Sequence, residues 1–511
     1  MKRLLTPSSA IVSVAITVLF ASSVAANDFQ TVRVSAESPF AQGCNGEPPR
    51  DATLYRNAEV EPYVAVDPRN QAHLVGVWQQ DRWSNGGANG LLTGVSRDGG
   101  KTWTRTFAHF SRCTGGNHRN RGDYARTTDP WVTFAPDGTV HQIALSFNDS
   151  NGKQAILASR SRDGGSTWSE PAQLTRDTDF DVGLDKQSIT ADPHDSRFVY
   201  AVWDRLVGLT NDDPARFFGP IWFSRTTNGG TSWEKARMIF DPGANAQTIG
   251  SIIVVLPNGD LLNTFTLVRD AYGASPLYVA VMRSHDRGVS WSEPTIVDSL
   301  RTVFVTDPQD GHPVRTGDIL PAIAVNPSSG AVYLVWQDSR FNGGARDQIA
   351  FSRSNNGGRT WSPPKRINKV PGTQAFTASI NVTRDGTIGV TYYDFRSDTP
   401  TAATLLTSYW MVTSQDGGDS WTESRIARPF DMRTAPDAGG FFVGDYEGLS
   451  ASLVPFFGTA NSGSAANRTD IFAGLSAESD EQGNQGGQVS NTTQQSVRQR
   501  IKAHREVHPD R

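Results

Sequence analysis

The sequence predicts an all-β protein, a seven-bladed β-propeller of four-stranded antiparallel blades, with six blades as the alternative. Three observations favour this fold: a short motif that recurs six times, a strand–turn–strand pattern before each copy, and a composition biased towards glycine and aromatic residues. The 511 residues include 48 Gly, 25 Phe and 13 Trp but only 5 Met, which is typical of strands joined by tight turns.

The recurring motif reads Ser/Thr-x-Asp/Asn-x-Gly-x-Ser/Thr-Trp. Its copies begin at Ser96, Ser161, Thr226, Ser284, Ser354 and Ser414, with spacings of 65, 65, 58, 70 and 60 residues. In each copy the Asp or Asn can accept hydrogen bonds from its own turn, the glycine allows a positive φ, and the Trp covers the sheet. Because catalysis would not need six copies, we interpret the motif as scaffold.

A second repeated pattern lies upstream of each motif: a strand, a Pro/Asp/Gly turn, a second strand, then an aromatic residue followed by Asp and often Arg. Its copies span 63–82, 131–149, 188–205, 251–267, 322–340 and 379–396. With a third strand before the motif and a fourth after it, each period holds the four antiparallel strands of a propeller blade. A last unit, 445–475, has no motif and lacks a fourth strand. Residues 29–35 can supply that strand and so remove an exposed sheet edge.

The two ends of the chain differ from this repeat region, which spans 27–476. Residues 1–26 have a basic start, an apolar run at 10–20 and small residues before Ala26, the order of a secretory signal peptide. A membrane anchor is the alternative, but the run is shorter than the roughly 20 apolar residues of a spanning helix. Residues 477–511 are polar and predict a disordered tail, with a membrane- or partner-binding role for 498–511 as the alternative.

The two cysteines also fit an exported, extracellular protein. Cys44 and Cys113 predict one disulfide in an oxidising compartment, with two free, buried thiols as the alternative. Four Asn-x-Ser/Thr sequons matter only in a host that glycosylates; they begin at Asn148, Asn381, Asn467 and Asn491.

Several function classes are excluded. The net charge is −4 and Lys and Arg do not cluster, so the chain lacks the basic patch of a nucleic-acid-binding protein. It contains no P-loop, dinucleotide fingerprint, serine nucleophile elbow or His-Glu-x-x-His motif, which excludes kinase, redox and serine-hydrolase chemistry.

Strand order predicts which face carries function. In an up-and-down blade the motif turns share one face with the short Pro/Asp/Gly turns, and the long, irregular loops lie on the other face, where function usually resides. The innermost strands begin near Glu61, Asp129, Asp185-Lys186, Asp318 and Asp445, so we expect carboxylates to ring the mouth of a central channel.

The six motifs resemble the Asp-box (BNR) repeats of the sialidase and neuraminidase superfamily, over residues 29–475. The resemblance implies a β-propeller and activity on a glycan. Sialidases of this family carry an early Arg-Ile-Pro motif, where this chain reads Thr-Val-Arg-Val-Ser at 31–35. The family's arginine triad and Tyr–Glu pair therefore have no matching motif in this chain.

We predict a secreted glycoside hydrolase that acts on an acidic extracellular glycan as a monomer. Such an enzyme needs two carboxylates across the scissile bond, and our candidates are Asp129 and Asp445. A uronate-glycan lyase is one alternative, with His118, Tyr124 and Arg126 on a single long loop as its catalytic groups. A non-catalytic glycan- or protein-binding propeller is the other.

Arginine and aromatic side chains suit an acidic sugar, because guanidinium groups pair bidentately with carboxylates and rings stack on pyranoses. The substrate-binding candidates are Arg82, Trp83, Arg126, Arg315, Arg340 and Arg396. The aromatic–Asp–x–Arg pattern recurs, however, so ion pairs between blades are the alternative for several of them.

No cofactor is expected, with Ca²⁺ as an alternative at one acidic loop. The candidate ligands are Asp177, Asp179, Asp181 and Asp185. The spacing supplies oxygen ligands but differs from that of an EF-hand loop in its glycine position and in lacking the final Glu.

Overall fold

A computed structural model describes residues 29–48, 51–210, 213–271, 276–401, 403–461 and 466–476. The all-β prediction is confirmed, because strands dominate these residues and the helices among them are 3₁₀ turns of three residues each. The predicted signal peptide and polar tail lie outside the described residues. In the ranges just given, no helix is long and apolar enough to cross a membrane.

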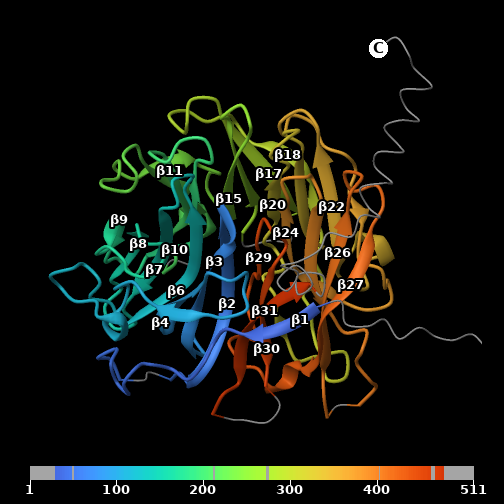
Figure 1. Ribbon diagram of the computed structural model, residues 1–511, viewed down its shortest axis with the longest axis horizontal. Helices are drawn as coiled ribbons and strands as arrows, with labels where there is room; N and C mark the ends of the chain where they lie inside the picture. Colours follow the sequence, from blue (N-terminus) through green and yellow to red (C-terminus); the bar gives the residue numbers. More distant parts are fainter. Residues whose placement is uncertain are drawn as a thin grey trace, which may run out of the picture.

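The strands follow one another in groups that match the sequence repeats (Figure 1). In chain order they are β1 Phe29–Arg33, β2 Leu54–Asp67, β3 Asn70–Trp83, β4 Ala88–Ser96, β5 Thr104–Thr106, β6 Arg126–Phe134, β7 Val140–Phe147, β8 Gln154–Ser161, β9 Ala172–Asp177, β10 Val182–Ala191, β11 Val199–Val207, β12 Phe218–Gly219, β13 Ile221–Thr226, β14 Arg237–Phe240, β15 Ala246–Val255, β16 Leu261–Val268, β17 Leu277–Ser284, β18 Thr295–Leu300, β19 Val314–Arg315, β20 Ala322–Val325, β21 Val332–Asp338, β22 Gln348–Ser354, β23 Lys365–Arg366, β24 Ala375–Val382, β25 Ile388–Asp394, β26 Leu406–Ser414, β27 Thr422–Asp431, β28 Phe441–Phe442, β29 Gly448–Leu449, β30 Pro455–Ala460 and β31 Thr469–Ser476. The 3₁₀ turns are η1 Arg112–Thr114, η2 Pro214–Arg216, η3 Arg340–Asn342 and η4 Met432–Thr434.

Successive strands of a repeat pair antiparallel, as in β6–β7–β8–β9, β15–β16–β17–β18 and β24–β25–β26–β27. The turn between β6 and β7 shows how the Pro/Asp/Gly sequence achieves this. Gly138 has a φ of 84° and its N–H donates to Ala135 O at 2.9 Å, while Asp137 Oδ1 accepts from Thr139 N at 2.9 Å. A side chain at Gly138 would be strained in that backbone conformation, so the glycine permits the tight reversal.

The recurring motif forms the turn between the third and fourth strands of a repeat. In the first copy, Asp98 accepts from Thr102 N at 2.9 Å and from Thr102 Oγ1 at 2.6 Å, and Gly100 N donates to Ser96 Oγ at 2.8 Å. The same bonds recur around Asp163 and Asp286. These carboxylates satisfy donors of their own turns, which agrees with a scaffold role.

The first strands of the repeats lie around the middle of the molecule. They contact one another in a closed series, β2, β6, β10, β15, β20, β24, β29 and back to β2. The colours in Figure 1 accordingly run from blue through green and orange to red and return to blue. The channel that these strands surround is where the candidate site lies.

The two ends of the described chain meet in one sheet. β1 pairs antiparallel with β31, from Phe29 opposite Ser476 to Arg33 opposite Phe472. β31 also pairs with β2 at one position, and Asp470 forms an ion pair with Arg33 and accepts from Ser35 Oγ at 2.8 Å. β31 is thus paired along both edges, with β30 on one side and β1 and β2 on the other, which protects it from pairing with another chain.

The core consists of apolar layers between neighbouring sheets. One such layer joins Trp131 and Ile143 of one repeat to Leu184 and Trp203 of the next, all at most 9% exposed. Large rings that fill these layers remove apolar surface from water, which is the main favourable contribution to folding.

The predicted disulfide is confirmed. Cys44 and Cys113 are bonded, with their Cα atoms 4.9 Å apart, and the sequence separation is 69 residues. Beside the bond, Arg112 Nη1 donates to Asn45 O at 2.8 Å. The bridge thus attaches the N-terminal segment to the long connection between β5 and β6.

Replacing both cysteines by serine is expected to lower the free energy of unfolding by about 4 kcal/mol. The loss arises because a closed loop of this length restricts the unfolded chain. Urea unfolding of the Cys44→Ser/Cys113→Ser variant measures it, and dithiothreitol should bring the wild type to the same midpoint. Equal midpoints for variant and oxidised wild type would contradict the expectation.

Candidate functional site

Five of the first strands share a β-bulge at the same place along their length. At each bulge the pairing with the second strand shifts, and one residue has a φ between 44° and 75°. These residues are Glu61, Asp129, Lys186, Gly250 and Thr377. A bulge re-aims the side chain that it carries, and non-glycine residues at positive φ are concentrated at functional sites.

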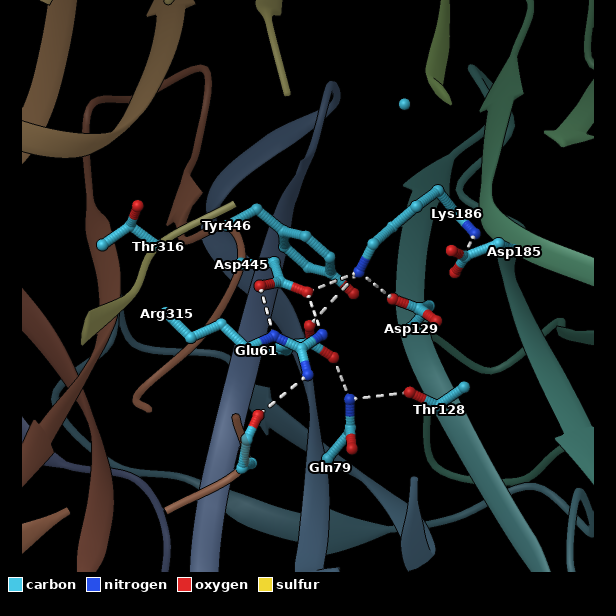
Figure 2. Close-up of polar contacts among 12 residues, drawn as sticks. Glu61, Gln79, Thr128, Asp129, Asp185, Lys186, Arg315, Thr316, Asp445 and Tyr446 are labelled. Atoms are coloured by element: carbon cyan, nitrogen blue, oxygen red, sulfur yellow. Dashed lines mark hydrogen bonds and ion pairs between the residues drawn. The ribbon is translucent and has the colours of Figure 1, made fainter. Parts of the chain in front are cut away.

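Three of the bulged residues, Glu61, Asp129 and Lys186, meet Asp445 at the ammonium group of Lys186 (Figure 2). Lys186 Nζ donates to Asp129 Oδ1 at 2.8 Å and to Asp445 Oδ2 at 2.7 Å, and it lies 3.5 Å from Glu61 Oε1. Arg315 clamps Asp445 from the other side, with Nε 2.9 Å from Oδ1 and Nη2 2.6 Å from Oδ2. We call these five residues, Glu61, Asp129, Lys186, Arg315 and Asp445, the central cluster.

Arg315 reaches the cluster on a long excursion of the chain. Between β18 and β20 the chain forms β19, which pairs in parallel with β28 and so brings Arg315 beside Asp445. The guanidinium of Arg315 lies 4.6 Å from the ring centre of Phe442, and that of Arg82 lies 4.8 Å from the same ring. Two cations from distant segments thus share one aromatic ring at the edge of the cluster.

A second layer of hydrogen bonds holds Glu61. Gln79 Nε2 donates to Glu61 Oε2 and to Thr128 Oγ1, the latter at 2.9 Å (Figure 2). Gln79 Oε1 accepts from Arg82 Nη1 at 2.8 Å. Arg82, predicted as a substrate ligand, therefore lies behind the cluster and is only 2% exposed.

The cluster is largely shielded from water. The exposed fractions of the side chains are 1% for Glu61, 5% for Asp129 and Asp445, 10% for Lys186 and 35% for Arg315. Below it, the channel holds a cavity of about 60 Å³ whose lining includes Lys186 and Asp445, room for a few water molecules.

The environment drives the pKa values of the carboxyl groups apart. Burial raises the pKa of Glu61 to about 8 and that of Asp185 to about 6. Burial would also raise the pKa of Asp445, but Lys186 and Arg315 outweigh it and hold that pKa well below its usual range. Burial would lower the pKa of Lys186, and the carboxylates of Asp129 and Asp445 instead keep it well above normal. Near neutral pH the site thus holds a protonated Glu61 beside an ionised Asp445 and a charged Lys186.

Glu61→Gln should make stability less dependent on pH. The folded chain keeps a proton on Glu61 up to about pH 8, whereas an ordinary Glu loses it near 4.5. This carboxyl therefore stabilises the fold fully at low pH, and its contribution is lost as the pH rises towards 8. Between pH 5 and 8 the free energy of unfolding should fall less steeply in the variant than in the wild type, by up to about 1.4 kcal/mol per pH unit.

Urea unfolding at pH 5, 6, 7 and 8 measures this difference. Glu293→Gln, at an exposed position, is the matched control and should follow the wild type. Parallel curves for wild type and Glu61→Gln would contradict the assignment of a raised pKa to Glu61.

Two half-buried carboxyl groups lie close in sequence to members of the cluster. Asp185 precedes Lys186, whose backbone N–H donates to Asp185 Oδ1 at 2.9 Å, and Figure 2 shows its carboxyl beside that backbone. Asp318 follows Arg315 by three residues, and burial raises its pKa to about 6. Both groups are more accessible than Glu61.

The structure brings three predicted site residues together, Asp129, Arg315 and Asp445. Tyr446 and Glu447 point apart: the Tyr446 ring packs edge-on against Trp131 at 5.3 Å, while Glu447 Oε2 accepts from Gly458 N at 2.9 Å.

His118 and Tyr124 lie elsewhere. Tyr124 is 1% exposed and belongs to an apolar layer with Leu91 and Phe110, and Lys153 Nζ lies 4.4 Å from its ring centre. His118 is exposed on the loop between β5 and β6. In the part of the chain that the structure describes, no hydrogen bond or ion pair joins either residue to the central cluster.

Four predicted sugar ligands have protein partners. Arg126 pairs with Asp149 at 2.9 Å and lies 4.4 Å from the ring centre of Trp83, whose own Nε1 donates to Asn89. Arg340 forms ion pairs with Asp338 at 2.8 Å and with Asp298, in the preceding repeat, at 2.9 Å. Arg396 forms ion pairs with Asp394 and, at 2.6 Å, with Glu423. For Arg340, these contacts favour the alternative of ion pairs between repeats.

The four carboxylates of the candidate Ca²⁺ loop have separate partners. Asp177 pairs with Arg205 at 2.7 Å, Asp181 accepts from Thr210 at 2.7 Å, and Asp185 lies beside the central cluster. Among the described residues, no group of three or more His, Cys, Asp and Glu side chains is arranged to hold a metal ion. Ca²⁺ binding here stays a prediction, which the melting temperature with and without EDTA tests.

Sequence reasoning placed Lys186 beside Asp185 at the start of an innermost strand but selected neither Lys186 nor Gln79 as a site residue. Lys186 occupies the bulge position that Glu61 occupies in the first repeat and Asp129 in the second, and in those two repeats the next residue is a proline, Pro62 or Pro130. Aligning the repeats on the residues before each first strand would have revealed this shared position.

The comparisons with known proteins add little to these observations. No protein-family model and no curated protein matches the sequence. Among solved structures, the chain is similar to the Hadza microbial sialidase Hz136, with 12% identity, a TM-score of 0.45 and coverage of 88% of this chain and 96% of that one. It is also similar to the GH93 α-L-arabinofuranosidase of Fusarium graminearum, with 14% identity, a TM-score of 0.46 and coverage of 71% of this chain and 93% of that one. For the intramolecular trans-sialidase from Ruminococcus gnavus, the identity is 13% and the TM-score is 0.41, and the match covers 70% of this chain and 95% of that one. At such identities and scores the likeness carries no argument about function.

Proposed function

We propose that this protein is a secreted, seven-bladed propeller that hydrolyses glycosidic bonds of an acidic extracellular glycan at the mouth of its central channel. The observation that carries the proposal is the convergence of Glu61, Asp129, Asp185 and Asp445 around Lys186, where burial raises the pKa values of Glu61 and Asp185 while Lys186 and Arg315 hold that of Asp445 well below its usual range. Glycoside hydrolysis requires such a pair, one carboxyl that holds a proton and one that is ionised.

Asp185 suits the role of proton donor. It is half-buried, so a substrate can reach it, and its pKa of about 6 lies close to neutral pH. A general acid works best when its pKa is near the operating pH. Glu61 holds its proton more firmly but is only 1% exposed.

Asp129 suits the role of the ionised carboxylate that acts on water. Its Oδ1 accepts from Lys186, and among the described residues no hydrogen bond reaches its Oδ2, which can therefore accept from the reacting water. In the step proposed, Asp185 protonates the leaving oxygen as the glycosidic C–O bond breaks. The water oxygen bonds to the anomeric carbon, and Asp129 takes the water's proton, so the products together gain one water molecule.

The charges of the cluster suit an acidic sugar. With Glu61 and the proton donor Asp185 both protonated, the carboxylates of Asp129 and Asp445 face three cations, Lys186, Arg315 and Arg82. Arg315, at 35% exposed, is the most accessible of the cluster's cations. A substrate carboxylate therefore meets a guanidinium before it meets an unbalanced negative charge.

The second candidate is a non-catalytic glycan-binding propeller. The observation that favours it is burial, because Asp129 and Asp445 are each 5% exposed and both are bonded to Lys186. The lyase alternative lacks such support, since Tyr124 and Arg126 are buried and have protein partners.

Digestion of mixed sialylated and uronate-containing glycans, read by mass spectrometry, tests the proposal. Hydrolysis gives products that gain one water per cleaved bond. A lyase would give an unsaturated end with no added water, and binding without any product would select the non-catalytic propeller.

A further inference from the structure

Phe304 is an exposed aromatic residue in an unfavourable backbone conformation. Its side chain is 63% exposed, and its φ is 57°. A bulky residue in the left-handed region is an outlier, and exposure of a phenyl ring adds nothing to folding. Neither property stabilises the fold, which points to a role in binding.

The segment around Phe304 is firmly held. Phe304 N donates to Thr302 Oγ1 at 3.1 Å, and Thr302 Oγ1 donates to Asp347 Oδ2 at 2.7 Å. Val303 N donates to the same carboxylate at 3.1 Å, and the next residue, Val305, is 2% exposed in the core. The ring is thus presented by a rigid backbone, which lowers the entropy lost when a ligand binds.

The anchor connects Phe304 to the candidate site. Thr302 Oγ1 lies 3.4 Å from Asp318 Oδ2. Burial raises the pKa of Asp318, and Asp445 of the central cluster is among the charges that raise it further. Asp347 also accepts from Gln337 Nε2 at 3.3 Å, and Gln337 Oε1 accepts from Thr377 N at 2.9 Å. Gln337 and Thr377 both line the channel cavity.

A groove of about 750 Å³ borders this anchor, because Arg346, one of its lining residues, directly precedes Asp347. It is also lined by Gln309 of the same excursion and by Gln374 and Asp398. Arg346 is exposed, and within the described ranges no ion pair joins its guanidinium to a carboxylate. Arg340 and Arg396, in contrast, are both engaged in ion pairs.

We propose that Phe304 and this groove form a second sugar subsite, which takes a pyranose that carries a carboxylate. The phenyl ring stacks on the apolar face of the pyranose, and Arg346 pairs with its carboxylate. The choice of a glycan as the ligand rests on the proposed function. A binding assay tests the subsite independently of cleavage.

The test is calorimetric titration with two acidic probes, a galacturonic acid tetramer and sialyllactose, together with the methyl ester of the tetramer. Phe304→Ala is expected to weaken the binding of an acidic probe about fivefold to tenfold. Phe180→Ala is the matched control, because Phe180 is 61% exposed on another loop, and it should bind like the wild type. Arg346→Gln should remove the preference for the tetramer over its methyl ester, while Arg162→Gln, exposed beside a motif turn, should retain it.

A fold role for Phe304 makes a different prediction. Phe304→Gly should melt no lower than the wild type, because glycine adopts a positive φ without strain. A lower melting temperature, unchanged affinity of Phe304→Ala, or no binding of either acidic probe would overturn the subsite. Binding that depends on Phe304 without any cleavage would support the subsite and contradict the hydrolase proposal alone.

Discussion

Asp129→Asn is expected to reduce glycan hydrolysis by about a thousandfold while leaving the fold intact. The variant removes the carboxylate that takes the proton of the attacking water, and acid–base catalysis contributes about 10²- to 10⁴-fold. The amide keeps the shape of the side chain and an oxygen that can accept from Lys186 Nζ, which retains its bond to Asp445. The initial rate of product formation measures the effect.

Asp241→Asn is the matched control for this variant. Asp241 is exposed, and its Oδ1 accepts from Gly243 N, a bond that an amide oxygen can also accept. The control should hydrolyse glycan at the wild-type rate. A fully active Asp129→Asn protein, with a urea midpoint close to that of the wild type, would end the assignment of Asp129.

Lys186→Met is expected to destabilise the protein by about 3 to 5 kcal/mol at pH 8. Removing the ammonium leaves the carboxylates of Asp129 and Asp445 buried without it, and breaking a buried ion pair on one side typically costs that amount. Lys186 is the largest cause that lowers the pKa of Asp445, so without the cation the folded-state pKa of Asp445 rises, and the variant loses stability relative to the wild type as the pH rises. The deficit should therefore shrink between pH 8 and pH 5.

Urea unfolding at several pH values measures this deficit, and two further variants complete the test. Lys186→Arg keeps the charge and should recover much of the loss. Lys235→Met, at an exposed position, should change the free energy of unfolding little. If Lys186→Met is as stable as the wild type from pH 5 to 8, the cluster does not hold the carboxylates as we describe.

The repeats made the fold class predictable, because each copy combines local strand and turn signals that need no long-range information. The disulfide was predictable for a similar reason, since the chain has only two cysteines. The role of the excursion between β18 and β20 was not predictable. Only the pairing of β19 with β28 shows that it carries Arg315 to Asp445.

The site was predictable in part. Strand order indicated that carboxylates such as Asp129 and Asp445 would gather at the channel mouth. The bulges were not visible, although they turn the side chains of Glu61 and Lys186 into the cluster. Along a regular strand the side chains alternate between the two faces of the sheet, but at a bulge they do not. A prediction of side-chain direction from this alternation therefore fails at the bulges that form the site.

The fate of Tyr124 and Arg126 illustrates a second limit. Their sequence lies in a polar, glycine-rich stretch that is typical of an exposed loop, and we therefore expected accessible side chains. Both are buried, because Tyr124 packs against Leu91 and Arg126 pairs with Asp149. Such contacts join distant segments and leave no local signal in the sequence.

Digestion in water enriched in ¹⁸O tests the central claim most directly. We expect the wild type to place one ¹⁸O atom at the anomeric carbon for each bond cleaved, and Asp129→Asn to release almost no labelled product in the same time. Cleavage that yields unlabelled, unsaturated ends, or equal labelling by wild type and variant, would contradict a hydrolytic site at the channel mouth.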